Sequence, residues 1–370
     1  MVIAERVTVG LTLETLAAEV DSGSIDTVLI AFPDMQGRLQ GKRLHARFFL
    51  DEVANLGSEG CSYVLAVDVE MNTVDGYRMS SWDQGYRDFV LRPDIATLRR
   101  VPWHPATALV FCDLEWDDGS PVVAAPRQVL RAQTDHLARR GWLAMVGTEL
   151  EFIVFRDSYE QAFERRYAGL APANQYNVDY SLQGTGRIEP LLRRIRNEMA
   201  AAGMHVESAK GECNLGQHEI AFRFDEAVAT CDKHSLYKLG AKEIAAQAGM
   251  SLTFMAKFDQ REGNSCHIHL SLRTPDGDPV FPSGRGGDFS PTGEHFVAGL
   301  LDGIRELTLF FAPNINSYKR YVAGSFAPTA IRWGRDNRTC AVRVVGHGAS
   351  LRLETACPAA MSTLTWPARQ

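Results

Sequence analysis

Acidic and imidazole side chains recur on four stretches of the chain whose sequences predict β-strands. In a strand, residues two apart point to the same face, so Glu149 and Glu151 share one face and Leu150 lies on the other. Carboxylate-rich sites with an occasional imidazole favour Mg²⁺ or Mn²⁺ over Zn²⁺. The spacing therefore predicts a cleft with divalent-metal ligands, and the candidate ligands are Glu149, Glu151, Glu212, Glu219, His267 and Glu354.

The same alternation appears twice more. In the stretch 266–272, His267, His269 and Ser271 share one face and aliphatic residues form the other. Arg352 and Glu354 share a face in the same way. A single alternating strand is more often the half-exposed face of a sheet, and a lone histidine is more often a core or surface residue. The metal-site hypothesis therefore depends on several such faces occurring in one chain.

Composition narrows the class of protein. The chain has 370 residues, of which 45% are hydrophobic and 23% charged, as in a soluble globular protein. Its net charge of -6 disfavours nucleic acid as a partner. No apolar run approaches ~20 residues, so no membrane span is expected. Seven cysteines without C-x-x-C spacing, and no apparent secretion signal, predict a reducing, cytoplasmic location without disulfides.

The pattern of elements predicts an α+β fold, an antiparallel sheet with helices on one face. We expect an N-terminal helix or arm at 1–20, a small domain at 21–118 and a larger one at 122–370. Strands 251–257 and 265–272 are predicted to pair with each other. The other predicted strands are 27–32, 39–45, 62–67, 108–113, 142–146, 149–155, 205–209, 218–224, 338–345 and 350–354, and the predicted helices are 11–20, 126–141, 188–202, 226–248 and 293–311.

Several separate motifs, in order, resemble those of the glutamine synthetase family over roughly residues 20–354. The motifs are Gly147–Phe152, Gly211-Glu212 with Gly216-Gln217-His218-Glu219, Gly263-Asn264-Ser265-Cys266-His267-Ile268-His269, Asn316–Arg320, and Asn337-Arg338 through Arg343 with Arg352-Leu353-Glu354. The resemblance implies a small N-terminal β-grasp domain and a catalytic domain with an antiparallel, barrel-like sheet and flanking helices. It also implies a ligase of glutamate and nitrogen metabolism that uses ATP, glutamate and two Mg²⁺ or Mn²⁺ ions per site.

The resemblance also implies a role for each matching residue. One metal ion would be held by Glu151, Glu212 and Glu219, and the other by Glu149, His267 and Glu354. Glutamate would be bound by Glu151, Gly263, His267, Arg320 and Arg338. ATP would be bound by Glu207, Phe224, His269, Ser271, Arg343 and Arg352. The catalytic residues would be Arg338, Asp75 and Arg320, and the amine site would comprise Asp75, Glu212 and Phe326.

One departure bears on the substrate. Phe326 stands where ammonia-using members carry a glutamate that takes a proton from ammonium. The loss of this acid favours a larger amine as the substrate. The amino-acid sequences of several motifs also resemble those of the actinobacterial branch that includes γ-glutamylpolyamine and γ-glutamylethanolamide synthetases. The expected function is therefore ATP-dependent γ-glutamylation of ethanolamine, a polyamine or a similar amine. Two alternatives stay open: a glutamine synthetase that uses ammonium, and an inactive relative with a binding or regulatory role.

The resemblance further implies assembly into a homo-oligomer. Asp75 and Trp82 match residues that one subunit contributes to the active site of its neighbour, so a hexameric ring is expected. A double ring is expected when the C-terminal helices of the family are present. After Glu354 the sequence leaves the family pattern, with Ala356 where an arginine is expected. A shifted reading frame would restore that pattern. We therefore expect a truncation or frameshift after Glu354.

Overall fold

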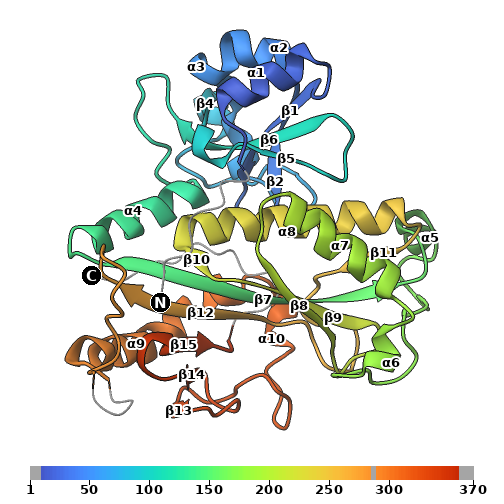
Figure 1. Cartoon of the computed structure of the whole chain (residues 1–370), viewed down its shortest axis with the longest axis vertical. Helices are drawn as coiled ribbons and strands as arrows, with labels where there is room; N and C mark the ends of the chain where they lie inside the picture. Colours follow the sequence, from blue (N-terminus) through green and yellow to red (C-terminus); the bar gives the residue numbers. More distant parts are fainter. Residues whose placement is uncertain (1–9, 285–288, 358–370) are drawn as a thin grey trace. The chain divides into compact units, whose positions relative to one another are not determined.

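A computed structural model describes residues 10–284 and 289–357 of the chain. The chain divides into two compact units. The first comprises Met1–Val129 and Asn197–His205, and the second comprises Leu130–Arg196 and Val206–Gln370. Each unit has its own β-sheet, as Figure 1 shows.

The first unit contains a sheet with the strand order β2-β1-β6-β4-β3, and β5 pairs with β6. Strand β1 pairs antiparallel with β2 and parallel with β6. The strands are β1 Thr27–Pro33, β2 Leu39–His45, β3 Ser58–Cys61, β4 Asp88–Pro93, β5 Arg99–Arg100 and β6 Thr107–Glu115, and the α-helices are α1 Leu13–Asp21, α2 Ala46–Phe48 and α3 Ala54–Leu56. The predicted helix at 11–20 and hairpin at 27–45 are confirmed.

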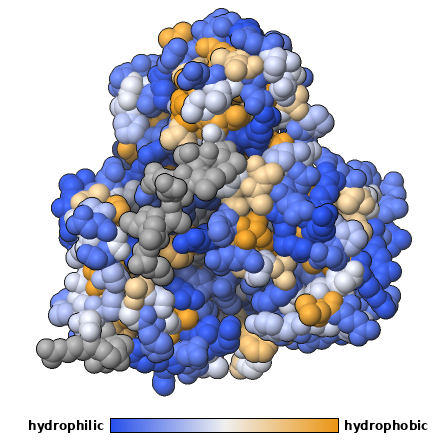
Figure 2. Space-filling view, viewed as in Figure 1, coloured by the Kyte–Doolittle hydropathy of each residue, from blue (hydrophilic) through white to orange (hydrophobic). Residues whose placement is uncertain are grey.

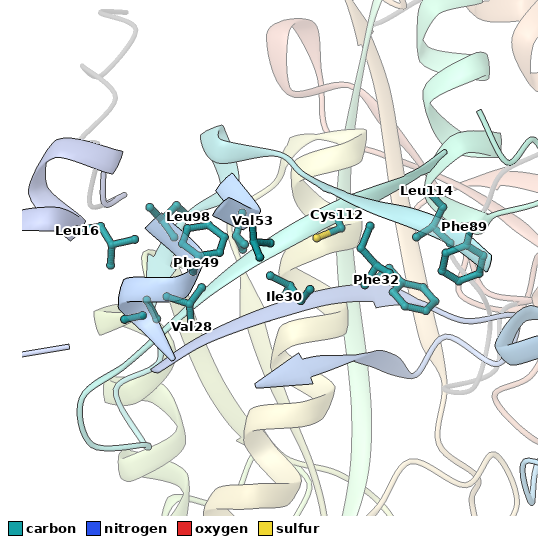
Figure 3. Packing of buried hydrophobic residues seen from close by; sticks show 14 of the residues in the cluster. Leu16, Val28, Ile30, Phe32, Phe49, Val53, Phe89, Leu98, Cys112 and Leu114 are labelled. Carbon is teal, nitrogen blue, oxygen red and sulfur yellow. The ribbon is translucent and has the colours of Figure 1, made fainter. Parts of the chain in front are cut away.

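The core of the first unit is a cluster of aliphatic and aromatic side chains from its sheet and helices (Figure 3). Strand β1 is apolar on both faces, and its five central residues are buried. Phe32 of β1 and Phe89 of β4 meet edge to face with their ring centroids 5.6 Å apart. Burial of apolar area of this kind supplies most of the free energy that holds such a small unit together.

The prediction of a strand at 62–67 is wrong. Residues Ser62–Leu65 form a 3-10 helix, which follows directly after β3. Ser62 and Leu65 are both buried, and this spacing of three suits a 3-10 turn rather than the period of two in a strand. Strand β4, which pairs with β3 and β6, was not predicted.

The second unit contains a larger sheet with the order β13-β14-β15-β12-β7-β9-β8, in which β10 and β11 also pair with β7. Its pairs are antiparallel except for β13 with β14. The strands are β7 Leu143–Phe155, β8 Val206–Gly211, β9 Gln217–Phe222, β10 Asp225–Glu226, β11 Ser251–Thr253, β12 Cys266–Arg273, β13 Trp333–Arg335, β14 Val342–Val345 and β15 Arg352–Thr355. Its helices are α5 Tyr159–Glu164, α6 Leu182–Thr185, α8 Ala227–Gln247, α9 Pro291–Phe311 and α10 Ile315–Tyr318, and the boundary between the units falls within α4 Pro126–Ala138 and within α7 Glu189–Ala201.

Two predictions about the strands around β7 are wrong. The strands predicted at 142–146 and 149–155 are one continuous strand, which passes through Gly147 without a break. The strands predicted at 251–257 and 265–272 do not pair with each other as expected, because β11 and β12 each pair with a different part of β7. The length of β7 explains both errors, since one strand of 13 residues offers room for several partners along its edges.

Strand β7 also separates the core of the second unit from its polar face. Helix α8 packs along it (Figure 1). On this side, Phe152 meets the ring of Tyr237 from α8 at 6.5 Å between centroids, and Thr148 lies 3.2 Å from His234. Glu149 and Glu151 alternate with these residues, as the period of a strand requires. Helix α8 therefore covers one face of β7, and the carboxylates lie on the other.

Figure 2 shows hydrophilic residues over most of the visible surface of the second unit, with hydrophobic residues in small separate groups. Across residues 10–284 and 289–357, no helix combines the length and apolarity that crossing a bilayer would require.

Candidate active site

The polar face of the large sheet borders a cavity of about 290 Å³ within the second unit. All six side chains predicted to bind metal line this cavity: Glu149, Glu151, Glu212, Glu219, His267 and Glu354. Four further predicted site residues also line it: Gly263, Arg320, Phe326 and Arg338. The sheet therefore brings residues more than 200 positions apart in the sequence to one place.

Strand register explains this convergence. His267 of β12 lies opposite Glu149 of β7, and Glu219 of β9 lies opposite Glu151. On the other edge of β12, Glu354 of β15 lies opposite His269. Side chains directly opposite each other in antiparallel strands have Cβ atoms about 5 Å apart, so each pair can share one ligand.

Three carboxylates form the tighter group in the cavity. Oxygen atoms of Glu151, Glu212 and Glu219 all lie within 4.8 Å of one another. Glu151 is held in place by Ser265, whose backbone N–H and Oγ donate to its two oxygens at 2.8 and 2.6 Å. Gln217 Nε2 donates to the same carboxylate at 3.0 Å. Such outer partners fix the direction of a metal ligand.

The second group is centred on His267. Its Nδ1 lies 3.4 Å from Glu149 Oε2 and 3.7 Å from Glu354 Oε1. Arg343 Nη1 donates to Glu354 Oε2 at 2.9 Å, and His269 Nε2 lies 3.1 Å from Glu149 Oε1. Each group contains the residues that the resemblance assigns to one metal ion, and the assignment itself stays a prediction. A donor set of carboxylate oxygens with one imidazole fits Mg²⁺ or Mn²⁺.

The acidic side chains disturb one another electrostatically. Burial, reinforced by the charges of Glu149 and Glu151, raises the pKa of Glu219 to about 8, although the charge of Lys210 opposes the shift. Burial and the charge of Glu151 also raise the pKa of Glu212. Burial disfavours the charged form of Glu149 too, but hydrogen bonds from His267 and its neighbour His269 outweigh it and hold the pKa well below its usual range. The cavity thus concentrates negative charge that a bound cation would neutralise.

Arg320 and Gly263 form another wall of the same cavity. Arg320 is buried, and burial lowers its pKa while the charge of Glu151 opposes the shift. Its aliphatic stem crosses Gly263 so closely that a Cβ there would lie 2.9 Å from Arg320 Cγ. The same Cβ would lie 2.2 Å from the carbonyl oxygen of Ala256. Glycine at 263 is therefore required for the close approach of Arg320.

The residues predicted to bind ATP lie along the sheet, and none of them is among those that line the cavity. Phe224 and His269 flank Gly147, where a Cβ would stand 3.4 Å from Phe224. Arg352 Nε donates to His269 Nδ1 at 3.2 Å, and Ser271 follows on the same face of β12.

Two of the predicted ATP ligands have other surroundings. Arg343 binds Glu354 and Asp336. Glu207 is exposed on β8 at the point where the register of β8 with β9 shifts.

Asp75 and Trp82 belong to the first unit, where both are exposed. Their contribution to the site of a neighbouring subunit stays a prediction.

Among the residues of this site to which the sequence assigned no role are Gln217, Ser265, Lys210 and Tyr180. Gln217 and Ser265 lie inside the motifs that contain Glu219 and His267, so their closeness to these predicted ligands in the sequence could have indicated a role in the site. Lys210 stands two residues before Glu212, and the period of a strand could have placed it on the same face. Tyr180 comes from the irregular segment before α6, and no spacing pattern connects it with the sheet.

Comparisons with known proteins agree with this geometry. The model of the glutamine synthetase catalytic domain matches residues 123–363. The chain is 67% identical over 356 residues to a γ-glutamylethanolamide synthetase from Streptomyces coelicolor. This alignment covers 96% of this chain and 76% of that protein. It is 34% identical over 344 residues to a glutamate–isopropylamine ligase from a Pseudomonas species, with coverage of 92% and 75%.

Solved structures give the same result. A complex of GmaS with ADP superposes with a TM-score of 0.82 at 27% identity, covering 95% of this chain and 77% of that chain. The chain thus spans about three-quarters of the length of these relatives. The match of the family model, the identity to the curated relatives and the agreement in fold show that the chain is a ligase of the glutamine synthetase family.

Proposed function

We propose that the chain activates the γ-carboxylate of L-glutamate with ATP and joins it to a small organic amine, with ethanolamine as the first candidate. The observation that carries this proposal is Phe326, whose apolar side chain borders the carboxylate-lined cavity where an ammonia-using member would carry an acid. The identity of 67% to a γ-glutamylethanolamide synthetase supports the same substrate class.

The first step transfers the γ-phosphoryl group of ATP to glutamate, so two anions have to approach each other. Mg²⁺ or Mn²⁺ held by the six ligands would supply charge neutralisation and alignment. Arg320 is placed to bind the α-carboxylate of glutamate, because its guanidinium keeps its charge when buried and its fork matches two carboxylate oxygens. Arg338, exposed at the cavity, is placed to meet the phosphoryl oxygens.

In the second step the amine nitrogen attacks the γ-carbonyl carbon, a C–N bond forms and phosphate leaves. The amine has to lose a proton, and the carboxylates of Asp75 and Glu212 are our candidates for holding its ammonium form and for accepting that proton. Phe326 is 73% exposed and carries no group that could accept a proton. It would present an apolar wall to the carbon atoms of the amine and keep water from the activated glutamate.

This function is tested by ADP release with glutamate and one amine at a time: ethanolamine, putrescine, spermine or ammonium. We expect an organic amine to give the highest kcat/KM and the γ-glutamyl amide to appear by mass spectrometry. Turnover of ammonium at least as fast as that of every organic amine would favour the glutamine synthetase alternative. The absence of ADP release with all of them would favour an inactive relative.

A substitution sharpens this test. Phe326→Glu restores the acid and should shift the ratio of rates toward ammonium by about tenfold or more. Phe163→Glu is the matched control, because Phe163 is 70% exposed on α5 and is not a lining residue of the cavity. An equal shift in both variants would show that the effect does not come from the amine site.

We further propose that the working form is a homo-oligomer, a hexameric ring in which Asp75 of one chain completes a neighbour's site. A cytoplasmic location and the number of metal ions per site also remain predictions. Light scattering that shows a stable monomer in the presence of Mn²⁺ and ATP would contradict the ring.

A further inference from the structure

One cation lies inside the carboxylate cluster itself. Lys210 of β8 forms an ion pair with Glu212 and stands opposite Glu219 in the strand register. Its side chain is 26% exposed, and that of Glu212 is 13% exposed. The ammonium also lies over the ring of Tyr180, with Nζ 4.8 Å from the centroid. Lys210 and Tyr180 both line the cavity.

This position conflicts with the expected use of the cluster. Glu212 would share a divalent cation with Glu151 and Glu219, whose oxygens lie within 4.8 Å of its own. A metal ion needs the oxygen lone pairs of its ligands and repels a nearby ammonium. Lys210 and the metal ion therefore compete for the carboxylate of Glu212.

We propose that Lys210 is an internal counter-ion, which holds Glu212 in the metal-free cavity and releases it when a divalent cation binds. Lys210 stabilises the crowded carboxylates in the absence of metal and thereby weakens the affinity for metal. Tyr180 gives the released ammonium a partner, because an aromatic face attracts a cation. The inference rests on the proposed function only in taking the three carboxylates as a metal site.

The test measures Mn²⁺ binding rather than amide synthesis, so its failure is distinct from a failure of the proposed function. We expect Lys210→Met to bind Mn²⁺ about tenfold more tightly than the unchanged chain, because neither an ion pair nor a repelling charge remains. Equilibrium dialysis at one fixed pH for all variants compares the affinities directly. The metal-free variant should also unfold at a lower temperature, and Mn²⁺ should raise that temperature more than it does in the unchanged chain.

Two controls separate this role from a structural one. Lys210→Arg keeps the charge and should leave the Mn²⁺ affinity within about threefold of the original. Lys233→Met removes the ion pair between Lys233 and Asp225. Lys233 is 25% exposed, close to the exposure of Lys210, but the pair does not line the cavity, so this variant should leave the Mn²⁺ affinity unchanged. Lys210→Gln serves as a second neutral variant in case the methionine variant does not fold. An unchanged or weaker Mn²⁺ affinity in the neutral variants would overturn the proposal.

Discussion

Buried charges occur in both units of the chain, but their surroundings differ. In the first unit, Arg127 is 4% exposed and lies between Asp94 and Asp113, with contacts of 2.6 and 2.5 Å. In the second unit, carboxylates outnumber lysines and arginines around the cavity, by seven to four. A buried cation held directly between carboxylates belongs to the architecture, whereas carboxylates gathered around a cavity mark a place that can receive a cation.

Removing one carboxylate of the cavity should have the largest effect on function. Glu219→Gln removes a proposed metal ligand, so we expect kcat/KM for the amide-forming reaction to fall by at least about a thousandfold. The metal-free chain should unfold at the same or a higher temperature, because repulsion from Glu149 and Glu151 is relieved. A loss of activity together with loss of folding would contradict this separation of roles.

Removing the central charge of the first unit should have the opposite effect. Arg127→Met leaves Asp94 and Asp113 without this partner, and we expect the free energy of unfolding to fall by about 3 kcal/mol. Mn²⁺ affinity of the folded fraction should remain the same. Urea denaturation measures the first quantity and equilibrium dialysis the second. A clear change in Mn²⁺ affinity would show that the two charge clusters are not independent.

Gly263→Ala tests whether the arginine wall of the cavity depends on close packing. The new Cβ would collide with the carbonyl oxygen of Ala256 and press on Arg320, so we expect KM for glutamate to rise about thirtyfold through misplacement of the guanidinium. Gly299→Ala in α9 is the matched control, because a Cβ there has no atom within 4 Å and should leave KM unchanged. A KM for glutamate in Gly263→Ala equal to that of the control would contradict the positioning role.

The raised pKa of Glu219 predicts a smaller, pH-dependent effect. Because the folded-state pKa lies above the unfolded value, this group contributes stability to the metal-free chain below about pH 4.5 and loses it as the pH rises through about 8. Metal binding displaces the proton, so Mn²⁺ affinity should rise with pH by up to about tenfold per unit until about pH 8. Glu219→Gln should remove the part of this rise above about pH 7, the value to which burial and Glu151 raise the pKa of Glu212. An unchanged slope up to about pH 8 would assign the proton to another group.

The sequence predicted which side chains gather around the cavity better than it predicted the strand pairing. The alternation around Glu149 and His267 is local information, and the period of two fixes which face each side chain occupies. The pairing of β11 and β12 with β7 depends on contacts between segments about 100 residues apart, and no local pattern records it. The 3-10 helix at Ser62–Leu65 shows the same limit, because a short apolar run fits two periods equally well.

Lys210 shows a further limit. Its spacing from Glu212 places it on the correct face, but that spacing does not show whether the lysine turns toward the carboxylates or into solvent. In the structure it pairs with Glu212 and lies over Tyr180, which comes from a distant irregular segment. The tail predicted to depart from the family after Glu354 is described only as far as Cys357, and the remainder of that prediction lies outside the described residues.

The location of bound metal tests the central claim most directly. Crystals soaked in Mn²⁺ and measured near the manganese absorption edge should give two anomalous peaks in the cavity of the second unit. We expect one peak among Glu151, Glu212 and Glu219, at about 2.2 Å from their oxygens, and the other among Glu149, His267 and Glu354. Peaks confined to other parts of the surface, or none in the cavity at saturating Mn²⁺, would contradict the assignment of these residues as a metal centre.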